Sequence, residues 1–225
     1  MMTPTRSRLV LGRRRMLHAL TGGLISMAAM QAAAQPARDP LSGRFGGPFS
    51  LIDHTGRRVS DTDYRGRYML VYFGFTRCTD TCPVDMPMIV AAMDRLGSRA
   101  AVLQPLFITV DPEDTAAKLK DYVTAFHPRL IGLTGSEEEL SAVARAYRVH
   151  RRKLLLPGEV VTPPQQHTRH PHSDHRHAQH GARFTIDHGS LTYLMGPDGA
   201  FLTLLPHNTG IDRRVDVLGR YLPAG

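Results

Sequence analysis

The chain has 225 residues, of which 42% are hydrophobic and 7% aromatic, values ordinary for one globular domain with a real core. Its formal charge of +8 is concentrated at one end, because the first 34 residues contain five arginines and no acidic residue. Without these arginines, 23 basic residues face 20 acidic ones, and the charge falls to +3. The rest of the chain has no basic stripe interleaved with aromatic residues, which argues against a nucleic-acid partner.

The first 34 residues have the layout of an export signal. A basic segment precedes a short apolar run that ends in small residues, so we expect cleavage after Ala34. The run Arg13-Arg14-Arg15-Met16-Leu17-His18 is similar to a twin-arginine signal, although Met16 stands where such signals prefer Phe. A membrane span needs about 20 apolar residues, and this run is too short and too rich in Ala and Gly for that. We therefore expect a periplasmic protein, with an inner-membrane anchor facing the periplasm as the alternative.

Residues 35–47 are rich in Pro, Gly, Arg and Ser, and we expect them to form a linker before a domain over 48–225. The residues Phe49 to Ile52 and Arg57 to Val59 are typical of a hairpin that turns at Gly56. The unbroken apolar run from Met69 to Phe75 predicts a strand buried on both faces.

This strand leads into the chain's only two cysteines, Cys78 and Cys82. Pro83 suits the first turn of a helix that we expect to run to Leu96, before Gly97. A helix N-terminus favours thiolate over thiol and makes a cysteine a better nucleophile and metal ligand. In an exported protein the alternative is a structural disulfide. A loop of about five residues restrains the unfolded chain little, so the position favours a functional pair.

Alternating strands and helices follow, which predicts βαβ crossovers and a parallel sheet core. We expect a strand over Val102 to Val110, a helix over Thr115 to Phe126 capped by Asp114, a strand over Arg129 to Leu133, and a helix opened by the capping box Ser136 and Glu139 and running through Tyr147.

Residues 151–183 break this pattern and are interpreted as an extended surface loop. Six histidines of this loop are His167, His170, His172, His175, His177 and His180. After it we expect a strand over Phe184 to His188, a hairpin of Leu191 to Met195 and Ala200 to Leu205, and a closing helix over Asp212 to Leu222.

The expected elements come in the order of the thioredoxin-like α/β fold, which has a central mixed sheet flanked by helices. This order is a strand, a thiol site, a helix, a βαβ unit, a hairpin and a last helix. The spacing is C-x-x-x-C, and here the sequence resembles the Sco/SenC family of copper-binding proteins. Its four matching blocks are Gly74 to Pro83, Thr109 to Glu113, Phe126 to Gly135, and Asp187-His188 with Tyr193 to Gly199. The resemblance covers about Phe49 to Leu222. The stretch after Glu113 and the inserted His-rich loop depart from the family pattern.

The resemblance implies that Cys78, Cys82 and His188 bind one copper ion, with Asp187 as a supporting residue. It also implies a role in building the binuclear copper centre of cytochrome c oxidase, whose copper-centre subunit would be a partner. Thiolates select Cu(I), imidazole accepts either copper state, and three ligands leave an open site for passing the metal on. A structural zinc site would want four ligands.

Two enzymatic functions use the same residues. Cys78 and Cys82 are a redox-active dithiol in a thiol–disulfide reductase of the periplasm without obligatory copper, and a peroxide-reducing redoxin of the same fold is the third candidate. The pair can also close to a disulfide, so copper loading would need a periplasmic thiol reductant. Other copper chaperones are further partners to consider. Loss of His188 discriminates, because copper delivery needs this histidine and dithiol exchange does not.

The roles of several other side chains can be interpreted in two ways. Asp187 orients the imidazole or ends the strand, and neighbours on a strand point to opposite faces. Arg77 offsets the negative charge of two thiolates or faces solvent. Asp111 faces partners or caps the following turn, and we expect the cap. His54, His127 and His207 are interpreted as structural or surface residues. The loop histidines bind Cu(II), Zn or Ni, or belong to a solvated loop of biased composition.

Overall fold

The computed structural model describes residues 41, 43–155 and 184–224. Nine strands form a seven-stranded sheet in the order β2-β1-β5-β4-β3-β8-β9 and a separate β6-β7 pair within these residues. The strands are β1 (Ser50–Asp53), β2 (Arg58–Ser60), β3 (Tyr68–Gly74), β4 (Leu103–Thr109), β5 (Ile131–Thr134), β6 (Arg151–Leu155), β7 (Phe184–His188), β8 (Thr192–Met195) and β9 (Phe201–Leu205). The helices are α2 (Cys82–Leu96), α3 (Ala116–Phe126), α4 (Glu137–Ala146) and α5 (Ile211–Tyr221), with 3-10 helices η2 (Asp61–Tyr64) and η3 (Gly97–Val102).

The sheet is mixed, as predicted. Its centre is parallel, because β3 pairs with β4 and β4 pairs with β5 in the same direction. The strands β1 and β8 join this centre antiparallel, and β9 extends it as a hairpin with β8. Strand β4 is buried along its whole length, as expected for a strand covered on both faces. Strand β3 lies between β4 and β8, so the loop that follows it and carries the cysteines leaves from the interior of the sheet and not from an edge.

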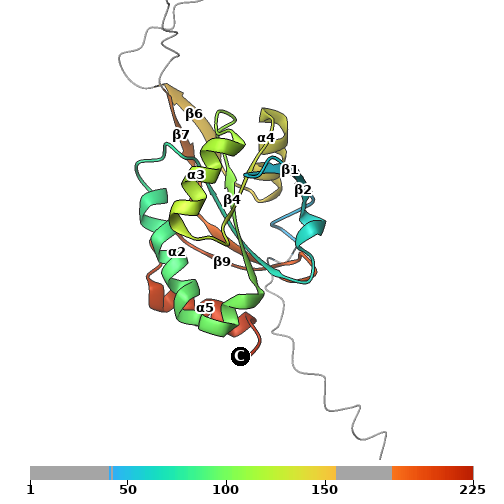
Figure 1. The fold of residues 1–225 in the computed structure, drawn as a ribbon, viewed down its shortest axis with the longest axis vertical. Helices are drawn as coiled ribbons and strands as arrows, with labels where there is room; N and C mark the ends of the chain where they lie inside the picture. The colour runs from blue at the N-terminus through green and yellow to red at the C-terminus, as the bar shows by residue number, and fades with distance from the viewer. Residues whose placement is uncertain (1–40, 42, 156–183, 225) are drawn as a thin grey trace, which may run out of the picture. The chain divides into compact units, whose positions relative to one another are not determined.

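Alternate residues of β3 divide the core into two layers. Val71 and Phe73 pack on the face that α4 covers. Leu70 and Tyr72 pack on the opposite face, beneath α2, α3 and α5. Figure 1 shows α2 and α3 along this second face, with α5 below the end of α2. The first turn of α2 thus stands over the carboxyl end of β3.

Local signals set most helix ends. Pro83 lies in the first turn of α2, and Gly97 ends this helix with a φ of +56°, a conformation that favours glycine. The capping box of Ser136 and Glu139 opens α4, as predicted. These two helices agree with the expected boundaries to within about one residue.

The predicted cap of α3 is wrong. Thr115 is the cap, and its hydroxyl accepts a hydrogen bond from the N–H of Lys118. Asp114 is buried and instead accepts hydrogen bonds from the N–H of Thr76 at 2.8 Å and the hydroxyl of Thr109 at 2.7 Å. Its carboxylate therefore joins the end of β4 to the loop that precedes Cys78.

The predicted extended loop over 151–183 is also wrong at its start. Residues 151–155 form β6, which pairs antiparallel with β7 from Arg151 opposite His188 to Leu155 opposite Phe184. The sequence of β6 has no apolar alternation, and its strand conformation comes from pairing with a segment far along the chain. The six loop histidines lie outside the described residues.

The end of the predicted linker belongs to the folded domain. The ring of Phe45 lies 5.9 Å from that of Tyr193 and 4.9 Å from that of Phe201 between centroids. The N–H of Gly46 donates to the carbonyl of Ala146 at 3.0 Å. The predicted signal and its cleavage position lie outside the described residues.

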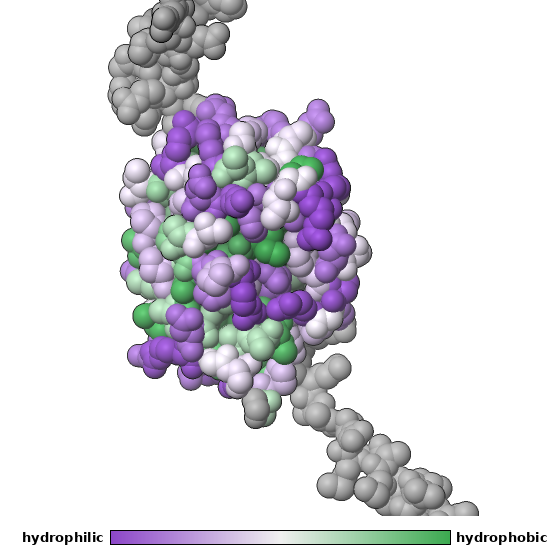
Figure 2. Space-filling view, in the orientation of Figure 1, coloured by the Kyte–Doolittle hydropathy of each residue, from purple (hydrophilic) through white to green (hydrophobic). Residues whose placement is uncertain are grey.

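Polar residues cover most of the face seen in Figure 2, and hydrophobic residues appear in small separate groups. Val84, on the first turn of α2, is an exposed large hydrophobic residue. Within the described segments, no helix combines the length and the apolar character needed to cross a membrane.

Candidate metal and thiol centre

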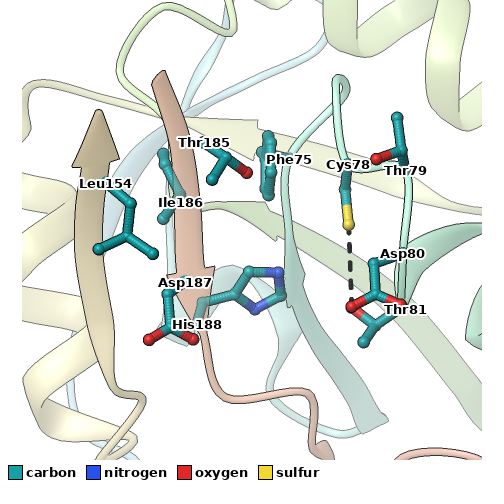
Figure 3. A pocket seen from close by; sticks show the side chains of 10 residues that line it. All are labelled: Phe75, Cys78, Thr79, Asp80, Thr81, Leu154, Thr185, Ile186, Asp187 and His188. Atoms are coloured by element: carbon teal, nitrogen blue, oxygen red, sulfur yellow. Dashed lines mark hydrogen bonds between the residues drawn. The ribbon is translucent and has the colours of Figure 1, made fainter. Parts of the chain in front are cut away.

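An open cleft of about 240 Å³ lies between the cysteine loop and the β6-β7 pair. Its lining residues are Phe75, Cys78, Thr79, Asp80, Thr81, Leu154, Thr185, Ile186, Asp187 and His188. Figure 3 shows the sulfur of Cys78 and the ring of His188 facing this cleft from opposite sides. Two segments that are distant in the sequence thus form one site.

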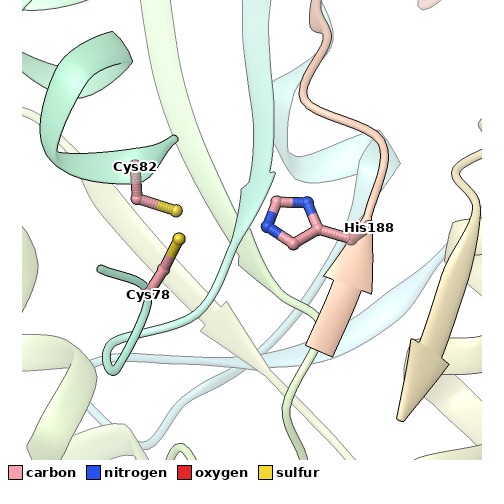
Figure 4. A group of neighbouring side chains, drawn as sticks. All are labelled: Cys78, Cys82 and His188. Carbon is pink, nitrogen blue, oxygen red and sulfur yellow. The ribbon is translucent and has the colours of Figure 1, made fainter. Parts of the chain in front are cut away.

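The three predicted ligands lie together. One ligand atom each from Cys78, Cys82 and His188 falls within 4.8 Å of the other two. Cys78 stands in the loop after β3, Cys82 is the first residue of α2, and His188 is the last residue of β7. Figure 4 shows the ring of His188 directed toward both sulfurs.

Arg151 holds the strand pair that carries His188. The residue pairs with His188 across β6 and β7, and its guanidinium donates to the carbonyl of Val110. The same guanidinium forms a hydrogen-bonded ion pair with Glu137 of α4, with one contact of 2.8 Å. These contacts tie the strand pair to the end of β4 and to α4.

The imidazole of His188 has one nitrogen free for a metal. Its Nδ1 lies 3.2 Å from the carbonyl of Gly189, which is an acceptor. When Nδ1 donates its proton to this carbonyl, the lone pair of Nε2 is available to a metal. The edge-to-face ring contact with Phe75, 5.8 Å between centroids, helps to fix the ring plane. A histidine with one N–H bonded to a carbonyl is a common arrangement for a metal ligand.

The two thiols differ in burial and in acidity. Both are free, Cys82 is fully buried and Cys78 is partly exposed. A hydrogen bond from Cys82 lowers the pKa of Cys78 well below its usual value, and His188 and the backbone N–H groups of Cys82 and Asp80 act in the same direction. The thiolate of Cys78 as acceptor, together with burial, raises the pKa of Cys82. The thiol of Cys82 is therefore the main group that activates Cys78, and the thiolate of Cys78 in turn keeps Cys82 protonated.

Gly74 leaves room for the buried sulfur. A Cβ at this position would stand 2.7 Å from Sγ of Cys82 and 2.8 Å from the ring of Phe107. Any side chain there would force one of them to move. The last residue of β3 thus has to be glycine for Cys82 to sit directly over the sheet.

Asp187 does not support the imidazole. Figure 3 shows its carboxylate pointing away from the ring of His188. It lies instead 3.3 Å from Nε2 of His150 and 3.5 Å from a guanidinium nitrogen of Arg152. This follows from the alternation of neighbouring side chains on a strand. The acidic residue therefore stabilises the outer face of the β6-β7 pair.

Arg77 is bound by two carboxylates of the β4-α3 loop. Its guanidinium lies 2.7 Å from a carboxylate oxygen of buried Asp111 and 3.2 Å from one of Glu113. The ion pair with Asp111 raises the pKa of Arg77, and these carboxylates already balance its charge. Asp111 also accepts the N–H of Glu113, the turn cap that was predicted. Arg77 therefore connects the cysteine loop to the β4-α3 loop. This contact was not among the two roles expected for Arg77, offsetting the charge of the thiolates or facing solvent.

Hydrogen bonds within the fold hold the three histidines that were expected to be structural or surface residues, His54, His127 and His207. His54 and His127 accept backbone N–H groups through Nδ1, from Gly132 and Arg129. His207 bonds to the buried carboxylate of Asp85 at 2.9 Å. Sequence reasoning missed Asp85, whose only signal was a charged residue on the inner side of a helix three positions after Cys82.

The donor set fits copper. The two sulfurs are soft ligands of the kind that select Cu(I), and the imidazole nitrogen suits either copper state. The open cleft gives a metal or a partner access to Cys78 and His188. A site with three protein ligands also leaves room for an incoming fourth. The residues are therefore compatible with binding and with transfer.

Comparison with known proteins places the chain among relatives of one kind. A family model described as SCO1/SenC matches residues 37–223. The human mitochondrial SCO1 homolog is 41% identical over 166 residues, which are 72% of this chain and 48% of that protein. SenC of Rhodobacter capsulatus is 33% identical over 194 residues, which are 86% of this chain and 77% of SenC. The chain spans about half the length of the human relative and of an Arabidopsis thaliana relative, of which 47% is covered.

Two similar solved structures contain copper. Arabidopsis thaliana ScoI with copper bound is 36% identical, with a TM-score of 0.64 over 79% of this chain and 97% of that one. Bradyrhizobium japonicum ScoI with copper bound is 33% identical, with a TM-score of 0.62 over 79% of this chain and 99% of that one.

The fold and the site define a thioredoxin-like domain in which two cysteines and a distant histidine form one donor group. The chain belongs to the SCO1/SenC family, because the family model matches most of the chain and SenC is similar to it over most of both sequences. The resemblance seen in the four sequence blocks is thereby confirmed.

Proposed function

We propose that the protein binds one copper ion through Cys78, Cys82 and His188 and passes it to, or reduces the cysteines of, the binuclear copper centre of cytochrome c oxidase. The convergence of the three ligand atoms within 4.8 Å supports this proposal most directly. Two similar structures hold copper, and the Sco family has been described as one of cytochrome c oxidase assembly proteins.

The test is an anaerobic Cu(I) titration of the reduced protein against a competing chelator. We expect a high-affinity endpoint of one ion per chain, and a loss of about 10-fold to 100-fold or more in affinity for His188→Ala, because the change removes a ligand outright. His150→Ala is the matched control, since His150 stands beside the same strand pair and bonds to Asp187. Equal affinities for the wild type and His188→Ala would refute the proposed site.

Thiol–disulfide reduction without copper is the second candidate. The low pKa of Cys78, the partly exposed thiol, favours it, because a thiolate beside a second thiol is the arrangement for disulfide exchange. The copper function requires His188, and disulfide exchange should survive His188→Ala. Turnover of peroxide by the reduced protein would favour the redoxin instead.

We also propose that residues 1–34 direct export to the periplasm and that a thiol reductant there keeps Cys78 and Cys82 ready for copper. The amino-terminal sequence of the protein recovered from the periplasm should begin at Gln35. Recovery of the uncleaved chain in the inner membrane would support an anchor instead.

A further inference from the structure

A buried polar group lies directly beside Cys82 and outside the donor set. The hydroxyl of Tyr72 stands 4.0 Å from Sγ of Cys82 and 3.4 Å from Oδ2 of Asp85. All three residues are buried. A phenol has one proton to donate, and a sulfur and a carboxylate both accept, so the two neighbours share one donor.

The carboxylate of Asp85 does not depend on that donor. Its Oδ1 accepts from Arg214 at 2.7 Å and from the N–H of Asn208 at 3.1 Å. Its Oδ2 lies 2.9 Å from Nδ1 of His207. Arg214 is 1% exposed and forms a buried ion pair with Asp85, so the negative charge is also compensated. The proton of Tyr72 can therefore turn to the sulfur while Asp85 keeps three partners.

The position of the hydroxyl is fixed by the strand. Tyr72 belongs to β3, and its ring packs on that of Phe107 with 6.2 Å between centroids. Its backbone pairs with both neighbouring strands, opposite Phe107 and Thr192. The phenol oxygen is thus held near Cys82 by the core itself.

We propose that Tyr72 is a positioning residue for copper, which donates its O–H to the sulfur of Cys82 when this sulfur binds the metal. The proposal rests on the proposed copper function. A metal-bound thiolate only accepts hydrogen bonds, and a hydrogen bond to it draws electron density away from the metal. Such a bond disfavours Cu(II) more than Cu(I), because Cu(II) needs the stronger donor. Tyr72 therefore biases the site toward Cu(I).

The test compares the wild type with Tyr72→Phe, which removes the hydroxyl and keeps the ring. We expect the variant to bind one copper ion and to favour Cu(II) roughly tenfold more, equal to a reduction potential about 59 mV lower for one electron. The thiolate-to-Cu(II) absorption band should move to longer wavelength. Tyr193→Phe is the control, because the hydroxyl of Tyr193 is buried with no hydrogen-bond partner among the described residues, and it should change neither quantity.

An infrared measurement of the S–H stretch in the reduced, metal-free protein tests the contact without copper. We expect Tyr72→Phe to shift the band assigned to Cys82 and Tyr193→Phe to leave it in place. Potentials and absorption bands equal to those of the wild type, in a variant with unchanged thermal unfolding, would overturn the role of Tyr72 and leave the proposed function standing. Failure of the wild type to take up copper would refute the proposed function, while the S–H band would still report whether the hydroxyl contacts the sulfur.

Discussion

At the scale of single residues, the two sulfurs of the site have different tasks. Cys78 is partly exposed and receives hydrogen bonds that stabilise its thiolate, while Cys82 is buried at the start of α2 and has a raised pKa, which favours the protonated thiol. An incoming disulfide or metal donor therefore meets Cys78 first. Cys82 gives up its proton when a metal binds its sulfur, or when it displaces the thiol of a partner from a mixed disulfide at Cys78.

The low pKa of Cys78 predicts how its reactivity depends on pH. An ordinary thiol, with a pKa near 8.5, reacts about 100-fold more slowly at pH 5 than at pH 7, because its thiolate fraction falls tenfold per unit. The pKa of Cys78 is lowered, so its thiolate persists as the pH falls below the ordinary value. We expect the rate of iodoacetamide labelling of the reduced protein to fall less than about tenfold over this range.

Cys82→Ala supplies the control for this measurement, because the bond from Cys82 is the largest cause of the lowered pKa. In that variant the pH dependence should move toward that of an ordinary thiol. A wild-type rate that falls about 100-fold between pH 7 and pH 5 would contradict the assignment.

The sequence allowed the nucleophilic pair to be predicted, but not the division of tasks within it. The position of both cysteines at a helix N-terminus follows from the apolar run, Pro83 and the spacing. The burial of Cys82 depends on Gly74 and Phe107, which meet only when β3 and β4 pair. The two effects that raise its pKa, burial and the neighbouring thiolate, are therefore tertiary properties.

At the scale of elements, the strand pair β6-β7 brings the histidine to the sulfurs. Neither strand belongs to the seven-stranded sheet, so their position depends on contacts such as those of Arg151 with Glu137 and Val110. The sequence predicted β7 from its residues and missed β6, because Arg151 to Leu155 has no alternating pattern. A strand that forms by pairing with a partner more than 28 residues away leaves no local signal.

Arg151→Ala should weaken copper binding without changing a ligand. The guanidinium anchors β6 opposite His188, and losing it frees the strand pair to move away from the cysteine loop. We expect Cu(I) affinity to fall about tenfold, the lower end of the range for residues that orient ligands. Competition titrations of the reduced protein measure the change.

Arg152→Ala is the matched control for that experiment. Arg152 is the next residue of β6, is exposed and pairs with Asp187 on the outer face. Its removal should leave the affinity within about a factor of two, as for a surface ion pair. Equal losses in both variants would mean that the charge of the strand, and not the anchor, matters for copper.

At the scale of the whole chain, local patterns were enough to predict the order of elements and the mixed sheet. The alternation of predicted strands and helices gave the parallel crossovers, and the turn residues between two apolar runs gave the hairpin of β8 and β9. The contacts that join α2 to α5 were not predictable in this way. Asp85 and Arg214 are 129 residues apart, and nothing in either helix alone marks them as a buried pair.

The His-rich segment connects the two strands of the pair that carries His188. β6 ends at Leu155 and β7 begins at Phe184, so residues 156–183 join strands that already pair with each other. Removing part of this segment should therefore leave the pairing, and the site at His188, in place. This makes deletion of residues 163–181 a clean test of the loop histidines as a second metal site.

We expect the deletion to lower the number of Cu(II) ions bound per chain, because short His-rich tracts bind Cu(II) through neutral imidazoles. The single high-affinity Cu(I) endpoint should persist, since Cys78, Cys82 and His188 remain. Loss of Cu(II) should be greater above pH 6.5, where imidazole is neutral, than at pH 5, where protonation already removes these ligands. Equal numbers of bound Cu(II) ions in the full chain and the deletion variant at neutral pH would show that these histidines do not bind Cu(II) and belong to a solvated loop of biased composition.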